Sequence, residues 1–113
     1  MQQIGRFAPS PSGRMHLGNV FSAMLAWLSI RSCGGRLVLR IEDLDPDRCR
    51  PAYADTLKRD LEWLGLTWDT EQTPQSRRSE AYREMFSRLE ERGLIYPCYC
   101  SRTELHAASA PHA

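Results

Sequence analysis

The chain of 113 residues is 42% hydrophobic, 9% aromatic and 26% charged, with a formal net charge of +1. This composition is typical of a globular domain and excludes a highly charged, disordered segment. No apolar run reaches the ~18 residues of a membrane span, and the opening MQQIGRFAPS lacks the basic-then-apolar order of a signal peptide. Four cysteines without an export signal indicate a reducing compartment. We therefore expect a cytoplasmic protein with no membrane partner.

The first elements in chain order form a strand, a helix and a second strand. Residues 3–8 favour a strand that ends at the breaker-rich run PSPSG. A helix is expected over 17–33, and apolar side chains around most of its circumference predict that it is buried. Two glycines at 34–35 end it. The near-continuous apolar order of 36–41 is typical of a buried parallel strand, so the segment predicts a βαβ unit.

Two amphipathic helices dominate the rest of the chain. Apolar residues at three- and four-residue spacing predict helices over 51–64 and 79–92, each followed by a glycine. The other segments are expected, in chain order, to be an acidic loop over 42–47, a short extended piece over 66–68, a polar loop over 70–78, an extended stretch over 94–100 and a final helix opened by the capping-box pattern of 101–104. We assign the tryptophans to the core, namely Trp27, Trp63 and Trp68.

The first candidate site is the turn that follows the first strand. Ligands of open parallel α/β sheets bind beyond the carboxyl ends of the strands, where a helix N-terminus offers N–H groups to anions. Gly18 in the first helical turn would let a nucleotide approach, and His16 just before it can donate to a phosphate oxygen. The turn matches neither the P-loop nor the GxGxxG pattern. A nucleotide site and a merely tight turn with a surface histidine both remain open.

The second and third candidates are a carboxylate pair and a cysteine pair. Glu42 and Asp43 follow the second strand directly, where a carboxylate can hold an ammonium group or a ribose hydroxyl. The alternative is a solvated acidic loop, which suits Asp45 and Asp47 better than Glu42. Cys98 and Cys100 stand one residue apart. Two thiolates can chelate zinc, although a structural zinc site needs four ligands. A metal site and a pair of plain thiols both remain open.

Three segments of the chain resemble the class I glutamyl-tRNA synthetase family. RFAPSPSG at 6–13 resembles the start of that family's catalytic domain, and HLGN at 16–19 occupies the place of its HIGH motif. RIEDLD at 40–45 resembles the family's RIED segment. Asn19 departs from the literal HIGH pattern, at a position that varies within the family. The resemblance covers residues 6–101.

The resemblance implies the α/β, Rossmann-like nucleotide-binding fold of class I aminoacyl-tRNA synthetases. This chain would supply its N-terminal half, with parallel strands and crossover helices. Residues 1–97 would belong to the catalytic domain, and 98–113 would begin a zinc-binding insertion. The family's KMSKS loop, the later tyrosine and arginine of its glutamate pocket and the second half of its sheet do not occur in these 113 residues. We therefore expect the isolated chain to be inactive.

The resemblance also implies roles for individual residues. The enzyme would be a ligase that activates L-glutamate with ATP and Mg²⁺ and transfers it to tRNA. His16 would be catalytic and, with Gly18 and Asn19, would bind ATP. Cys98 and Cys100 would be the first two ligands of a structural zinc ion. The glutamate pocket would comprise Arg6, Phe7, Ala8, Pro9, Ser10 and Glu42, with Glu42 on the α-ammonium group.

Several details favour one branch of the family, which attaches glutamate to the queuosine base of tRNA(Asp) and lacks an anticodon-binding domain. These details are PSPSG in place of PSPTG, the run RIEDLDP, the CYC triplet and the ASAPH tail. The alternatives are a discriminating glutamyl-tRNA synthetase that charges tRNA(Glu), or a non-catalytic nucleotide- or zinc-binding module. We expect the full-length protein to be a monomer.

Overall fold

The computed structural model describes residues 2–101 and 103–105. Contacts divide the chain into two compact units, Met1–Ser79 and Glu80–Ala113. The division concerns contacts within this chain, so the family-based boundary between residues 97 and 98 stays a prediction. The elements in chain order are β1 (Ile4–Phe7), α1 (Leu17–Ser32), β2 (Arg36–Arg40), α2 (Pro51–Trp63), β3 (Thr70–Gln72), the 3₁₀ helix η1 (Gln75–Arg78) and α3 (Ser79–Glu91).

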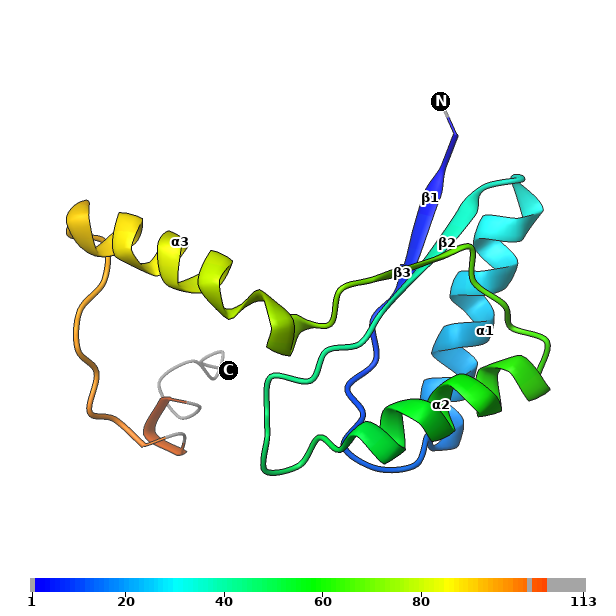
Figure 1. Ribbon diagram of the computed structural model, residues 1–113, viewed down its shortest axis with the longest axis horizontal. Helices are drawn as coiled ribbons and strands as arrows, with labels where there is room; N and C mark the ends of the chain where they lie inside the picture. The colour runs from blue at the N-terminus through cyan, green and yellow to red at the C-terminus, as the bar shows by residue number, and fades with distance from the viewer. Residues whose placement is uncertain (1, 102, 106–113) are drawn as a thin grey trace, which may run out of the picture. The chain divides into compact units, whose positions relative to one another are not determined.

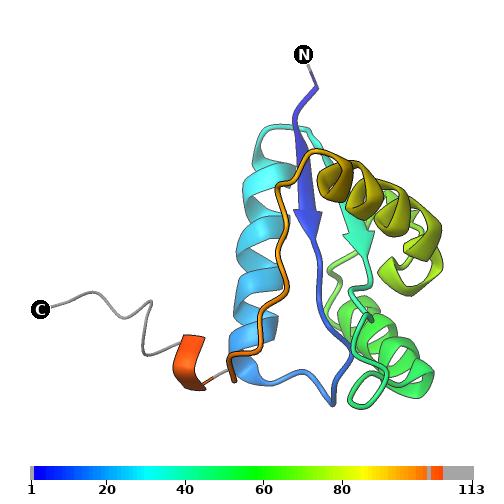
Figure 2. The ribbon, with the colours of Figure 1, turned by 90° about the vertical axis from the view of Figure 1, so that its left-hand side faces the viewer.

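The first unit is a three-stranded parallel sheet in the order β1-β2-β3. Phe7 lies opposite Leu39, and Arg40 lies opposite Gln72, so the carboxyl ends of the three strands lie at the same end of the sheet. Figure 2 shows β1 and β2 running in the same direction, and Figure 1 shows α1 and α2 on the same side of the sheet. The predicted βαβ unit is confirmed, and α2 adds a second crossover of the same kind.

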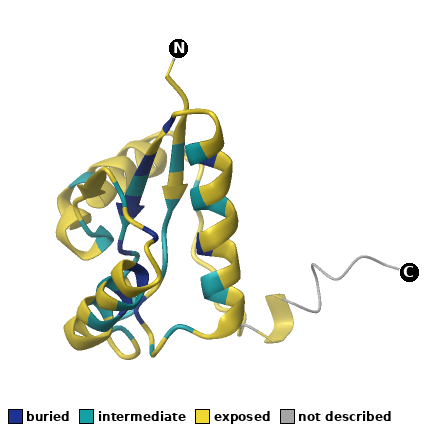
Figure 3. Ribbon diagram, turned by 90° about the vertical axis from the view of Figure 1, so that its right-hand side faces the viewer, coloured by how far each residue is buried: buried dark blue, intermediate teal, exposed yellow. Residues whose placement is uncertain are grey.

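The core lies between β2 and the two helices. Alternate residues of β2 face it, because successive side chains of a strand point to opposite faces. Leu39 is 1% exposed and Ile41 is 3% exposed. The cluster comprises Ala23, Leu39, Ile41, Leu57, Leu61 and Leu66. The buried residues of β2 and α2 are dark blue in Figure 3.

The prediction that α1 is a buried helix is wrong for these residues. Only Ala23 and Ile30 are buried, while Leu17 is 83% exposed and Phe21 and Leu28 are more than half exposed. Most of this helix is yellow in Figure 3. The sheet and α2 cover one side of the helix, and its apolar residues extend beyond that side. Within the described residues, the outer edge of β1 is also unpaired, since β1 pairs with β2 alone.

The three tryptophans differ in their environment. Trp27 and Trp68 pack against the core cluster, as predicted, and the indole N–H of Trp27 donates to the carbonyl of Thr67 at 3.0 Å. The assignment of Trp63 to the core is wrong, because this residue is 86% exposed. It is the last residue of α2, and the core-facing positions of that helix are taken by leucines.

The segment after α2 folds differently from its sequence pattern. Residues 66–68 were expected to be extended, yet the third strand lies at Thr70–Gln72, inside the predicted polar loop. All three residues of β3 are exposed. Burial therefore does not hold the strand in place, and its backbone pairing to β2 does. Asp69 fixes the entry to the strand: its N–H donates to Leu37 O at 2.9 Å, and its Oδ2 accepts from Leu37 N at 2.6 Å.

The second unit contains α3 and the residues after it. The helix carries a strong apolar stripe, as predicted, and ends before Gly93, which has a φ of 64°. The predicted capping box is confirmed: Glu104 Oε2 accepts from the N–H and hydroxyl of Ser101, both at 2.6 Å. In the described part of the chain, no helix is both long and apolar enough to cross a membrane.

Candidate functional site

The carboxyl ends of β1 and β2 meet at one place. The N–H of Glu42 donates to the carbonyl of Pro9 at 2.9 Å, which ties the residue after β2 to the loop after β1. A cleft of about 430 Å³ opens beside this loop. Its lining includes six of the residues predicted for glutamate and ATP, namely Phe7, Ala8, Pro9, Ser10, His16 and Asn19. Arg6, Gly18 and Glu42 lie next to these residues in the chain or by contact, but do not line the cleft.

His16 is the N-cap of α1, and its ring is fixed by the backbone. Its Nδ1 accepts from the N–H of Gly18 at 3.1 Å, and its own N–H donates to Oδ1 of Asn19 at 3.2 Å. Because Nδ1 accepts, the neutral ring is assigned the tautomer with its proton on Nε2. A single donor is therefore held at the positive end of the α1 dipole. That arrangement suits a phosphate oxygen.

Gly18 is required by the position of that ring. A Cβ on residue 18 would lie 3.0 Å from Cε1 and 3.1 Å from Nδ1 of His16. The expectation of free N–H groups at this helix end is wrong for two of the first residues, since the N–H of Gly18 donates to the His16 ring and that of Asn19 donates to the His16 carbonyl. The site presents the imidazole to an anion in place of those amides.

Glu42 is held by an arginine that the motif alone does not single out. Nη2 of Arg40 lies 2.5 Å from Oε1 of Glu42, and both side chains are mostly buried. The solvated alternative applies to the neighbouring loop: Asp45 pairs with Arg48 at 2.9 Å, with both side chains well exposed. The two kinds of carboxylate that the sequence distinguishes are thus distinct in the structure. Sequence reasoning missed Arg40, and its i, i+2 spacing from Glu42 at the end of β2 was the available signal.

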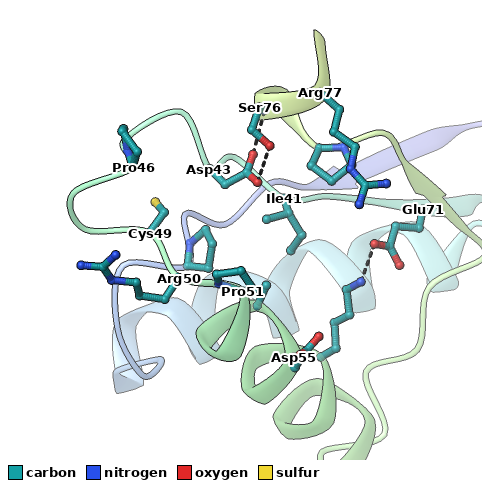
Figure 4. A pocket seen from close by; sticks show the side chains of 14 residues that line it. Ile41, Asp43, Pro46, Cys49, Arg50, Pro51, Asp55, Glu71, Ser76 and Arg77 are labelled. Carbon is teal, nitrogen blue, oxygen red and sulfur yellow. Dashed lines mark hydrogen bonds and ion pairs between the residues drawn. The ribbon is translucent and has the colours of Figure 1, made fainter. Parts of the chain in front are cut away.

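Asp43 lines a second pocket of about 530 Å³, whose lining does not include Glu42 (Figure 4). Its carboxylate accepts from the N–H of Ser76 at 2.9 Å and from the Ser76 hydroxyl at 2.7 Å. Burial raises the pKa of Asp43, but these hydrogen bonds outweigh it and leave the pKa below its ordinary value. Across the pocket, Lys58 pairs with Glu71 at 2.5 Å. These polar groups satisfy one another, so Asp43 serves to anchor η1.

The family model "tRNA synthetases class I (E and Q), catalytic domain" matches residues 4–111. The chain belongs to this family. Its three-stranded parallel sheet with crossover helices is part of the Rossmann-like fold of the class I aminoacyl-tRNA synthetases, as the sequence predicted.

Individual relatives agree with this assignment. The chain is 53% identical to the glutamyl-Q tRNA(Asp) synthetase of Symbiobacterium thermophilum over 117 residues, which cover 96% of this chain and 36% of that protein. It is 51% identical to the enzyme of the same name from Deinococcus radiodurans, covering all of this chain and 37% of that one. The chain thus spans about a third of the curated relatives that it matches.

Solved structures of the family show the same fold. A glutamate tRNA ligase from Elizabethkingia meningosepticum, in complex with its amino acid, has a TM-score of 0.70 and 31% identity, over 97% of this chain and 24% of that one. The glutamate-tRNA synthetase of Elizabethkingia anophelis has a TM-score of 0.71 at the same identity and coverage.

The cysteine pair does not form a complete metal site within the described residues. Cys98 and Cys100 are both exposed. No group of three or more His, Cys, Asp or Glu side chains placed to hold a metal occurs among residues 2–101 and 103–105. His106 and His112, which could complete a set on paper, lie outside the described residues. Two thiols are half of a structural zinc site, so no chemistry of this chain is assigned to zinc.

Proposed function

We propose that this chain is the N-terminal portion of a synthetase that activates L-glutamate with ATP and transfers it to the queuosine base of tRNA(Asp). The carboxylate of glutamate would attack the α-phosphorus of ATP, which gives glutamyl-adenylate and releases pyrophosphate. The hydrogen bond from Glu42 N to Pro9 O carries the proposal, because it brings a carboxylate to the loop that lines the cleft. The names of the relatives support the choice of amino acid and acceptor.

The residues after β1 would bind glutamate. Arg6 is exposed and lies opposite Val38, whereas Phe7 faces the core. Arg6 therefore lies on the same face of the sheet as Arg40, one strand away. A guanidinium suits the side-chain carboxylate of the substrate, and the Glu42 carboxylate suits its α-ammonium group. Phe7, Ala8, Pro9 and Ser10 would form the wall between these two charges, as they line the cleft.

ATP would lie at the start of α1, with its phosphates toward His16 and Gly18. The Nε2 proton of His16 would stabilise the negative charge that develops on the α-phosphate during attack, and the dipole of α1 would add to that effect. Asn19 would act indirectly, since its Oδ1 holds the His16 backbone. Mg²⁺ would enter with ATP and neutralise its phosphates. Catalysis of this kind depends on positioning and electrostatics.

The remaining parts of the proposed enzyme lie in length that the relatives have and this chain does not cover. Within this chain, Cys98 and Cys100 would provide two of four zinc ligands, at the start of an insertion over 98–113. The unpaired outer edge of β1 and the exposed apolar residues of α1 support a further layer of the same domain. The exposed α1 side chains would then be covered by that layer.

The test is glutamate-dependent exchange of pyrophosphate into ATP, measured on the full polypeptide that contains these residues. His16→Ala should lower the exchange rate by roughly 10²-fold or more if the ring stabilises the transition state. An unchanged rate would remove His16 from the mechanism. The 113-residue chain alone should show little exchange, and robust exchange would contradict the view that half of the site is elsewhere.

The acceptor is tested separately. Transfer of labelled glutamate to queuosine-containing tRNA(Asp), with none to tRNA(Glu), is the expected result. The opposite result would favour a discriminating glutamyl-tRNA synthetase, for which the two Elizabethkingia structures are the argument. Binding of ATP without any exchange in the full polypeptide would favour a non-catalytic module.

A further inference from the structure

Arg40 occupies an unusual position at the end of β2. Its neighbours Leu39 and Ile41 belong to the core and are almost fully buried. Since side chains alternate along a strand, Arg40 points to the other face of the sheet. Its side chain is nevertheless only 18% exposed, and its Nε is buried without a hydrogen-bond partner.

The burial of this guanidinium is not explained by a structural network. Among the described residues, its one polar contact is the ion pair between Nη2 and Oε1 of Glu42, at 2.5 Å. An arginine that stabilises a fold commonly binds both oxygens of a carboxylate or several carbonyls. Desolvation of a charge with so few partners costs stability. Buried polar groups that lack partners call for an explanation, and function is one of them.

The contact leaves half of the Glu42 carboxylate available. Oε1 is engaged by Arg40, and no hydrogen bond from a described residue reaches Oε2. The backbone of the same residue is fixed independently, because its N–H donates to Pro9 O. Glu42 is therefore held at its backbone and at one carboxylate oxygen, while the other carboxylate oxygen is free of contacts from the described residues.

We infer that Arg40 is a positioning residue for the amino-acid substrate: it holds Oε1 of Glu42 so that Oε2 accepts a hydrogen bond from the substrate α-ammonium group. Arg40 itself does not touch the substrate. The inference rests on the proposed function. It adds that Arg40 affects glutamate binding in two ways, through its charge and through its hold on Glu42. A guanidinium near an ammonium site repels that cation, so Arg40 would weaken binding if it did nothing more than contribute charge. Positioning and charge alone thus predict opposite effects of its removal.

The experiment replaces Arg40 in the full polypeptide that contains these residues, and measures KM and kcat for glutamate and for ATP in pyrophosphate exchange. Arg40→Gln should raise the KM for glutamate about tenfold or more. The magnitude is taken by analogy from metal sites, where loss of a side chain that orients a ligand weakens binding by about 10-fold or more. The KM for ATP should stay within about twofold, because the proposed ATP site lies at the start of α1, at residues that Arg40 does not contact. Arg40→Lys keeps the charge but not the planar fork, and should recover part of the loss.

Two further variants separate positioning from a structural role. Arg36→Gln is the matched control: it removes an arginine from the same face of β2 at the opposite end of the strand, where the side chain is exposed, and should leave the glutamate KM unchanged. In a Glu42→Gln background, Arg40→Gln should add less than about twofold, since its effect passes through that carboxylate.

Each other outcome overturns the inference. A glutamate KM that is unchanged or lowered in Arg40→Gln would leave charge as the only role of Arg40. Equal increases in the KM values for glutamate and ATP, together with a lower melting temperature and no recovery in Arg40→Lys, would make the role structural. A wild-type protein without glutamate-dependent exchange would overturn the proposed function, and this inference with it; an active wild type with unaffected variants would overturn this inference alone.

Discussion

The sharpest prediction concerns Gly18, whose missing side chain accommodates the His16 ring. In Gly18→Ala, the new Cβ would lie 3.0 Å from Cε1 and 3.1 Å from Nδ1 of that ring. An ordinary contact needs 3.4 Å or more, so the ring must move by a few tenths of an ångström. The bond from the residue 18 N–H to Nδ1 lengthens from 3.1 Å as the ring moves away.

The expected effects on stability and activity differ. Loss of one exposed hydrogen bond costs about 0.5–1.5 kcal/mol, and replacement of glycine by alanine in a helix recovers up to about 1 kcal/mol. These two values nearly cancel, so the free energy of unfolding should stay within about 1 kcal/mol of wild type. In the mechanism proposed for His16, the displaced imidazole is misaligned toward the phosphate, and a misplacement of about 1 Å can cost 10²-fold in rate. For the smaller shift here, we expect a loss of about tenfold.

Three measurements check this reasoning. Glutamate-dependent pyrophosphate exchange on the full polypeptide gives the rate, and urea unfolding gives the stability. Nitrogen chemical shifts of the His16 ring in the 113-residue chain should indicate the Nε2–H tautomer in wild type and a more mixed state in Gly18→Ala. Gly13→Ala is the matched control, because no atom lies within 4 Å of its added Cβ and it belongs to the same turn. A Gly18→Ala protein with the wild-type rate and ring shifts would refute the argument.

Two further predictions concern the fold. Leu39→Ala empties the most buried position of the core and should lower the free energy of unfolding by about 2–5 kcal/mol in urea titration; a loss no greater than that of the half-buried Val38→Ala would contradict the described core. The N–H of Leu37 is the main cause that lowers the pKa of Asp69, and Arg31 adds to it. Asp69 therefore stabilises the fold fully above its ordinary pKa of 3.8 and loses that contribution as the pH falls through the lower folded value. Asp69→Asn should melt at a lower temperature than wild type at neutral pH, with a difference that shrinks in acid; a constant difference would contradict the linkage.

The elements that could be predicted from the sequence are those with a clear local pattern of apolar, glycine and proline residues. The strands β1 and β2 and the three α-helices follow from periodicity and from the glycines and prolines that bound them. The meeting of the segments that follow β1 and β2 was also predictable, since the carboxyl ends of two neighbouring parallel strands lie at the same end of the sheet. His16 and the residues of the cleft are found where the motif resemblance located them, while their roles stay predictions that the variants test.

The remaining features depend on partners that a linear pattern does not contain. The apolar circumference of α1 indicates that something covers it, but not that the covering group lies within these residues. β3 has three exposed residues and exists because β2 offers its backbone. The role proposed for Arg40 depends on its contact with Glu42, which follows it by two residues and lies beyond the end of β2. The ring of His16 accepts a hydrogen bond from the N–H of Gly18, a group that was expected to be free at the N-terminus of α1.

The contact between Asp43 and Ser76 has a consequence for where the protein tolerates change. Polar, exposed connections usually accept inserted residues, and the segment 70–78 has that composition. Here, however, Gln75 N donates to Ile41 O at 3.1 Å, and Ser76 is bound twice by Asp43. A tag or reporter loop placed between β3 and α3 would pull on the residues that flank Glu42. This stretch is therefore a poor place to build in new sequence, however surface-like its composition.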